Sequence, residues 1–156
     1  MREYAYAAYI IVLALWFGGN AIFSFIVTPV IFRSFDREMA GSIVGHIFPP
    51  YFSLNLVLSG LSALLIITLN KTTARYSLFA SAMLIAIALC INMLQSAIIH
   101  PQVKVLKMQM RSKDKNADLS SLKKRFGKLH GISVGLNLIL ILDVLALLII
   151  SRNLIV

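Results

Sequence analysis

Charged residues and cysteines are scarce in this chain of 156 residues. Only 13% of the residues are charged and 59% are hydrophobic, which leaves too little polar surface to cover a soluble domain. A single cysteine, Cys90, excludes an intramolecular disulfide, a CxxC pair and a thiolate metal cage. Because it lies in an apolar stretch, we expect it to be a small buried packing residue. The GxSxG, HExxH and P-loop motifs are also absent, which favours a protein without enzymatic activity.

The sequence contains several long apolar runs. A transmembrane helix needs roughly 20 apolar residues, and four segments are long enough. They are residues 6–32, 51–69, 76–99 and 131–150. The first run is far longer than a signal-peptide core, so we interpret it as a retained span. In the first connection, Ser34 or Asp36 can cap a short helix before Pro49 and Pro50 start the second span. The sequence therefore predicts one all-α integral membrane domain, a bundle of four transmembrane helices over residues 1–156.

The positive charge is concentrated in the connection 101–128. Nine of the 15 Lys and Arg residues lie between Lys104 and Lys128. With Arg33 and Arg37, the connections after the first and third spans hold eleven cations, against four on the other side. The positive-inside rule then places this connection in the cytoplasm and both termini outside, in a bacterial inner (plasma) membrane.

The basic connection itself suits anionic lipid headgroups, each cation near the surface contributing about 1 kcal/mol. The residues assigned to such contacts are Lys123, Lys124, Arg125 and Lys128. The alternative is a solvated loop that only sets the topology. Binding to nucleic acid is not expected, because Phe126 is the only aromatic residue there to stack on a base.

An internal repeat relates the two halves of the chain. At one constant offset, Asn20, Ser24 and Pro29 match Asn92, Ser96 and Pro101. At a second offset, Gly45, Asn55 and residues 54–58 match Gly127, Asn137 and residues 136–140. The offsets differ because the third connection is longer than the first. We therefore predict two repeated helical hairpins, related by an axis along the membrane normal.

The repeat places one asparagine in every span, at a similar depth. Polar residues of this kind face the bundle, where they either hydrogen-bond between helices or line a cavity for a ligand or ion. The candidate ligand-binding residues are Asn20, Ser24, Asn55, Asn92, Ser96 and Asn137.

The three histidines, His46, His100 and His130, all fall at the predicted cytoplasmic ends of apolar segments. Imidazole binds haem iron and transition metals, so haem or a transition metal is a candidate cofactor. The histidines show no tight ligand spacing, and interfacial hydrogen bonding remains the alternative.

Asp143 is the only charged residue within a span. On insertion scales it costs about 2.5–3.5 kcal/mol near the bilayer centre, so it must be paired, protonated or facing water. Helical spacing separates it from Asn137 by roughly 240°, so we expect it outside the asparagine layer, at a homo-oligomer contact or an outward cavity.

Short motifs in a fixed order also suggest a family. They are residues 16–19 with Phe25, Pro29 and Phe32; residues 40–41 and 47–49 with Tyr51; and Phe126, residues 129–133 and Asn137. Together they resemble the transmembrane protein 205 family, or domain of unknown function 4149. The resemblance implies a four-span membrane protein whose eukaryotic members are associated with platinum-drug resistance. The chain is also distantly similar to copper-resistance D proteins and four-span haem-binding protoporphyrinogen oxidases, relatives that use histidine with a metal or haem.

Three functional hypotheses follow. The first is a non-enzymatic protein that binds or passes a small solute or metal ion at a polar site between the hairpins. The second is a haem- or metal-binding redox protein that uses the histidines His100 and His130. The third is a structural or lipid-interacting protein in which the basic connection is the functional element.

Overall fold

The computed structural model describes residues 2–69, 75–111 and 118–154, and every described element is helical. In chain order the elements are α1 (Arg2–Ile22), the π-helix η1 (Phe23–Val27), α2 (Thr28–Ser34), α3 (Arg37–Leu69), α4 (Arg75–Leu94), the π-helix η2 (Gln95–Ile99), α5 (His100–Arg111), α6 (Leu119–Ser151) and the 3₁₀-helix η3 (Arg152–Leu154).

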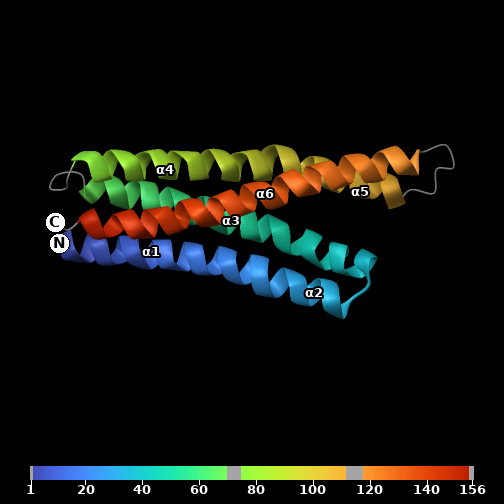
Figure 1. Cartoon of the computed structure of the whole chain (residues 1–156), viewed down its shortest axis with the longest axis horizontal. Coiled ribbons are helices and arrows are strands. Elements are labelled where there is room, and N and C mark those ends of the chain that lie inside the picture. Colours follow the sequence, from blue (N-terminus) through green and yellow to red (C-terminus); the bar gives the residue numbers. More distant parts are fainter. Residues whose placement is uncertain (1, 70–74, 112–117, 155–156) are drawn as a thin grey trace.

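These elements join into four long helices, Glu3–Ser34, Arg37–Leu69, Tyr76–Arg111 and Leu119–Leu154, each long and apolar enough to cross a membrane. The prediction of an all-α, four-span integral membrane protein is confirmed. At roughly 1.5 Å per residue each helix is about 50 Å long, well beyond the ~30 Å of a hydrocarbon core. Both termini lie at one end of the bundle, and the excess length, in residues 37–50, 100–111 and 119–130, lies at the other (Figure 1).

Both π-helices lie just before a proline, which is the second residue of the next helix. A proline has no N–H and its ring crowds the carbonyl four residues back, so the usual α-helical bond cannot form at Pro29 or Pro101. The hydrogen-bonded turn is one residue longer instead. The N–H groups of Thr28 and His100 donate to the carbonyls five residues back, those of Phe23 and Gln95. Each first helix of a hairpin thus contains the same local irregularity.

The second helix of each hairpin begins in the same way. The Asp36 carboxylate accepts from the N–H groups of Glu38 and Met39, both at 2.9 Å. Asp118 accepts in the same manner from Ser120 and Ser121, at 3.1 and 3.2 Å. These are N-caps, which satisfy N–H groups that have no partner in the first turn of a helix. Of the two caps considered for the first connection, Ser34 and Asp36, the chain uses Asp36.

These features repeat at the offsets seen in the sequence. The offset in residue number between η1 and η2 is the same as the offset between Asn20 and Asn92. The helices α3 and α6, both 33 residues long, and their capping aspartates are separated by the distance that relates Asn55 to Asn137. The repeat seen in the sequence therefore extends to the backbone geometry of the two hairpins.

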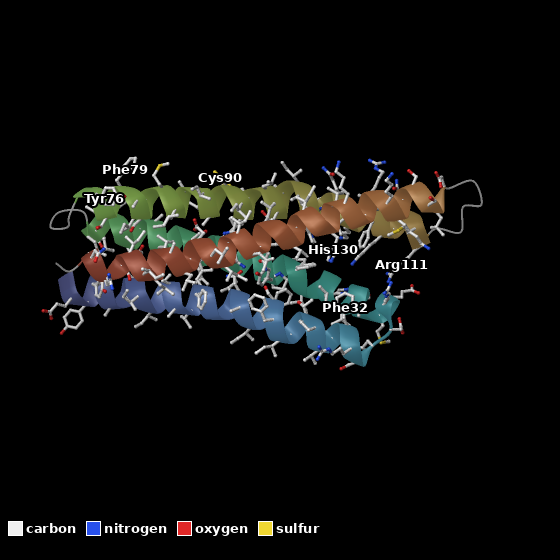
Figure 2. The ribbon with its side chains drawn as sticks, viewed as in Figure 1. Phe32, Tyr76, Phe79, Cys90, Arg111 and His130 are labelled. Atoms are coloured by element: carbon white, nitrogen blue, oxygen red, sulfur yellow. The ribbon has the colours of Figure 1, made fainter. Side chains whose placement is uncertain are left out.

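Two sequence expectations about local structure were wrong. The structure has no short helix ending before Pro49 and Pro50, because α3 runs from Arg37 through both prolines without a break. Cys90 is exposed on the outer side of α4 (Figure 2), and is not a packing residue. The helical period explains this, since Ile85, Ala88 and Asn92 turn the other face of α4 to the core.

The four long helices form a ring in which α1 contacts α3 and α6, and α4 also contacts α3 and α6. The core contains buried side chains from all four helices: Tyr9, Leu13 and Trp16 from α1, Leu58 and Ile66 from α3, Ile85 and Ala88 from α4, and Leu140, Val144 and Leu147 from α6. Large apolar side chains such as Leu15, Leu64 and Leu142 face outward, as expected for surfaces in contact with lipid.

Candidate functional site

A buried hydrogen-bond network joins α1 to α3 within the first hairpin. Asn55 Oδ1 accepts from Trp16 Nε1 at 2.7 Å and from Asn20 Nδ2 at 2.8 Å. The Asn20 amide also donates to the Trp16 carbonyl at 2.7 Å, and Asn55 Nδ2 donates to the Tyr51 carbonyl at 2.9 Å. These bonds occupy the amides of Asn20 and Asn55, both of which are buried.

The network continues into the second hairpin through Tyr51. Its hydroxyl contacts Asn20 Oδ1 and lies 2.6 Å from Asn137 Oδ1, while Asn137 Nδ2 donates to Ser24 Oγ at 2.7 Å. A hydroxyl has one proton, so Tyr51 can donate to only one of the two amides. With the Asn137 amide turned over, its nitrogen donates to Tyr51 and its oxygen accepts from Ser24, which satisfies every group.

The equivalent asparagine of the second hairpin is not part of this network. Asn92 is fully buried, and neither its Nδ2 nor its Oδ1 has a hydrogen-bond partner among the described residues. Ala88 and Ser133 stand where the first hairpin has Trp16 and Tyr51, and they are too small to provide the same bonds. The expected layer of four asparagines therefore contains three connected members and one isolated member.

Nearby polar residues of the second hairpin pair differently. Ser133 Oγ donates to Gln95 Oε1 at 2.8 Å, whereas Gln95 Nε2 has no partner among the described residues. Ser96, expected beside Asn92, bonds to the Met93 carbonyl of its own helix at 3.3 Å. Among the described residues, the amides of Asn92 and Gln95 thus have unpaired groups, whereas the amides of Asn20 and Asn55 in the first hairpin are bonded.

Asp143 is buried in α6 and is 7% exposed. Its Oδ2 has no hydrogen-bond partner among the residues that the structure describes. The aspartate is separate from the asparagine network, in keeping with its position on a different helical stripe.

The three histidines occupy three different environments. The exposed His46 places Nδ1 2.8 Å from the Ser42 carbonyl. His100 makes edge contacts with Phe48 and Phe52, with ring centroids 5.9 and 5.6 Å apart. His130 stacks on Phe126 of its own helix at 5.8 Å. Across residues 2–69, 75–111 and 118–154, no group of three His, Cys, Asp or Glu side chains is placed to hold a metal ion.

A pocket of about 300 Å³ lies between α3 of the first hairpin and α5 of the second. We call it the interhairpin pocket; its lining residues are Gly41, Ser42, Gly45, His46, Phe48, Pro49, His100, Val103, Lys104, Lys107, Met108 and Arg111. His46 and His100 share this pocket, and His130 is not in its lining. The lining residues belong to the segments 41–49 and 100–111, which lie toward the end of the bundle away from the termini (Figure 1).

Sequence reasoning missed the interhairpin pocket. A signal for it was present, because His100, Lys104, Lys107 and Arg111 recur at helical spacing and so share one face. The sequence did not indicate where residues 37–50 lie. This segment was expected to contain only a short helix, but it forms the first part of α3.

Lys107 is the lining cation with the most contacts to other helices. Its ammonium donates to the Gly41 carbonyl at 2.8 Å and lies 5.8 Å from the centroid of the Phe126 ring. Lys107 lies beyond the apolar segment 76–99, and burial, followed by the neighbouring charge of Arg111, lowers the pKa of its ammonium from the ordinary value. This side chain links α5 to both α3 and α6.

The residues assigned to lipid headgroups are all exposed and lie on the first turns of α6: Lys123, Lys124, Arg125 and Lys128. None of them lines the interhairpin pocket. They form a basic surface at the end of the bundle away from the termini, separate from the pocket cations on α5.

Fold and site together define a four-span helical membrane protein with a hydrogen-bonded polar core and a pocket between its two hairpins. The chain matches the domain of unknown function 4149 (DUF4149) over residues 11–112 and belongs to that family. It is similar to an uncharacterized protein of Aquifex aeolicus (strain VF5), with 32% identity over 130 residues, 83% of each chain. No solved structure matches this chain.

Proposed function

We propose that this protein binds a small polar solute in the interhairpin pocket. The observation that carries the proposal is the composition of the pocket wall, because side chains of α3 and α5 bring both hairpins to one cavity. Its volume of about 300 Å³ falls at the lower end of the range typical of small-molecule sites. His46, Ser42 and the lysines of α5 supply polar groups beside the apolar surfaces of Phe48 and Val103.

The asparagine network supports a different role for the residues first considered as ligands. Asn20, Asn55 and Asn137 use their amides to join helices to one another, and Ser24 is part of the same network. In this proposal they hold the two hairpins together at a fixed distance, and the solute binds nearer the end of the bundle, in the pocket. Passage of the solute across the membrane would require the hairpins to separate at this network.

The orientation of the pocket follows from the cation distribution. With the basic connection in the cytoplasm and both termini outside, the pocket opens on the cytoplasmic side of a bacterial inner membrane. The bacterial relative is consistent with that location. The exposed lysines and arginine of α6 would then contact anionic headgroups of the inner leaflet.

A ligand screen on the purified full-length chain tests the proposal. Acetate, inorganic phosphate, ethylamine and glycerol are each titrated in detergent while the midpoint of thermal unfolding is recorded. At least one of them should raise the midpoint, because a ligand that binds only the folded state stabilises it. Gly45→Phe, which fills the pocket, should abolish the shift.

Gly127→Phe is the matched control, because Gly127 is the repeat equivalent of Gly45, is exposed and has nothing within 4 Å of an added Cβ. This variant should keep the shift of the unmodified chain. The proposal fails if none of the four probes shifts the midpoint, or if both variants lose the shift equally.

The second candidate function, a haem- or metal-binding redox protein, has one specific observation in its favour. His46 and His100 line the same pocket, so two imidazoles are available from two helices. The resemblance to copper-resistance D and haem-binding proteins points the same way. An absorption spectrum and elemental analysis of the purified protein test it, and the absence of both a Soret band and stoichiometric metal would remove it.

A homo-oligomer is a further proposal. Asp143, which was expected at its contact, is buried within the bundle, so that expectation was wrong. Light scattering in detergent tests the oligomer, and the mass of a single chain would contradict it.

A further inference from the structure

The interhairpin pocket has a strong bias of charge. On the α5 wall, Lys104, Lys107 and Arg111 share one helical face with His100. On the α3 wall, Gly41 and Gly45 present backbone in place of side chains, and no aspartate or glutamate lines the cavity. Three positive side chains therefore face a space whose lining contains no carboxylate.

Lys107 is held in place for binding by contacts that leave donors free. One N–H bond of its ammonium is used by the Gly41 carbonyl at 2.8 Å. A lysine ammonium has three donors, so two remain for a ligand. Because the Gly41 and Phe126 contacts restrict the side chain, a ligand pays little additional entropy to order it.

Arg111 lines the pocket and also pairs with a carboxylate outside the lining, that of Glu38. Its Nε lies 3.5 Å from Glu38 Oε1, and both side chains are mostly exposed, at 54% and 78%. An exposed pair of this kind contributes little to stability. The guanidinium can therefore exchange this partner for a ligand, and it is suited to bind two oxygens of one anion at once.

We infer that the solute of the interhairpin pocket carries a phosphate group, bound by Lys104, Lys107 and Arg111; this inference rests on the function proposed above. A phosphate offers several anionic oxygens, which match the donors of two ammonium groups and a guanidinium. The same three positive charges oppose a divalent cation. The apolar surfaces of Phe48, Val103 and Met108 leave room for a short organic substituent. The phosphate can come from a soluble phosphate ester or from a phospholipid headgroup.

Calorimetric titration of the full-length protein in a neutral detergent, with inorganic phosphate and glycerol phosphate as probes, tests the soluble source. Saturable binding is expected, and the double exchange Lys104→Gln with Lys107→Gln should weaken it roughly tenfold or more, because charged hydrogen bonds are lost. Arg33→Gln with Arg37→Gln is the matched control, which removes the same charge from exposed positions that do not line the pocket. It should leave the affinity within about twofold, as expected for screened surface charges.

Lys104→Gln with Arg111→Gln provides a second variant that keeps the Lys107 contact to Gly41. This variant should also lose phosphate affinity roughly tenfold or more. It keeps the inference testable if Lys104→Gln with Lys107→Gln disturbs folding. Phosphate binding that both pocket variants leave unchanged, or that the control reduces as much as they do, would overturn the inference.

Native mass spectrometry after extraction from membranes containing phosphatidylglycerol tests the lipid source. A retained phosphatidylglycerol that the pocket variants lose and the control keeps supports a phospholipid headgroup as the source of the phosphate. If neither the soluble probes nor the lipid depend on the pocket cations, the inference is wrong. In that case, a midpoint shift by ethylamine or glycerol that Gly45→Phe abolishes would still support the solute-binding function. If no probe shifts the midpoint, both the phosphate inference and the solute-binding function are wrong.

Discussion

The two repeat-related asparagines Asn20 and Asn92 should respond in opposite directions to the same substitution. Both are buried, with 2% and 0% of their surface exposed, so an exchange for leucine removes an amide of similar size from similar surroundings. Asn20 bonds to the Trp16 carbonyl, to Asn55 and to Tyr51. Asn92 has no partner among the described residues. The difference between the variants therefore isolates the hydrogen bonds.

The magnitude follows from the contacts. Hydrogen bonds between membrane helices contribute about 0.6 kcal/mol each, so Asn20→Leu should cost roughly 2 kcal/mol for its three bonds. Nothing else becomes unpaired, because Asn55 keeps Trp16 Nε1 and Tyr51 keeps Asn137. An unsatisfied buried polar group costs about 1–3 kcal/mol, so Asn92→Leu should stabilise the protein by about 1–2 kcal/mol.

The free energy of unfolding can be measured by titrating the protein in mixed micelles with a denaturing detergent and following helix content. The expected result is a lower midpoint for Asn20→Leu and a higher one for Asn92→Leu, with similar slopes. If Asn92→Leu destabilises the protein as much as Asn20→Leu, the Asn92 amide is satisfied in the membrane, and the difference drawn between the two hairpins is wrong.

Three further experiments test other parts of the structure. Tyr51→Phe removes the hydroxyl that links the hairpins and should lower the free energy of unfolding by about 1 kcal/mol; Tyr4→Phe, at an exposed tyrosine, should not change it. Asp36→Ala and Asp118→Ala each remove an N-cap and should cost about 1 kcal/mol by the same assay; similar losses are expected from the two repeats, and a loss at only one would argue against their equivalence. Exchange of Lys123, Lys124 and Arg125 for glutamine should reduce the enrichment of anionic lipid around the protein in mixed nanodiscs, and unchanged enrichment would count against a headgroup role for this surface.

Several features of the fold could be predicted because each depends on local chemistry. The apolar runs require helices in lipid, which fixed the number of spans. Pro29 and Pro101 were expected to end the first helix of each hairpin. The structure shows a π-helix just before each proline, but the helices continue to Ser34 and Arg111. Asp36 was recognised as an available cap and is used as one.

Other features depended on which residues meet across the bundle. Trp16 and Tyr51 entered the sequence comparison only as family motif residues, yet both donate hydrogen bonds in the buried network. The four asparagines appeared equivalent in the sequence. In the structure Asn92 has no hydrogen-bond partner among the described residues, because Ala88 and Ser133 are too small to provide the bonds. The three histidines were all expected at the cytoplasmic ends of the spans, and the lining of the pocket includes two of them, His46 and His100.

The sequence by itself determined the solvent, the helices and the duplication, because hydropathy, proline chemistry and repeated residues act over one or two helical turns. Only the tertiary structure decided which polar groups are satisfied and where a solute can bind. Those outcomes depend on contacts between residues far apart in the chain, such as Tyr51 with Asn137 and Lys107 with Gly41. The physical reason is that hydrogen-bond distances and cavity shape are set by the packing of two hairpins, which no local pattern specifies.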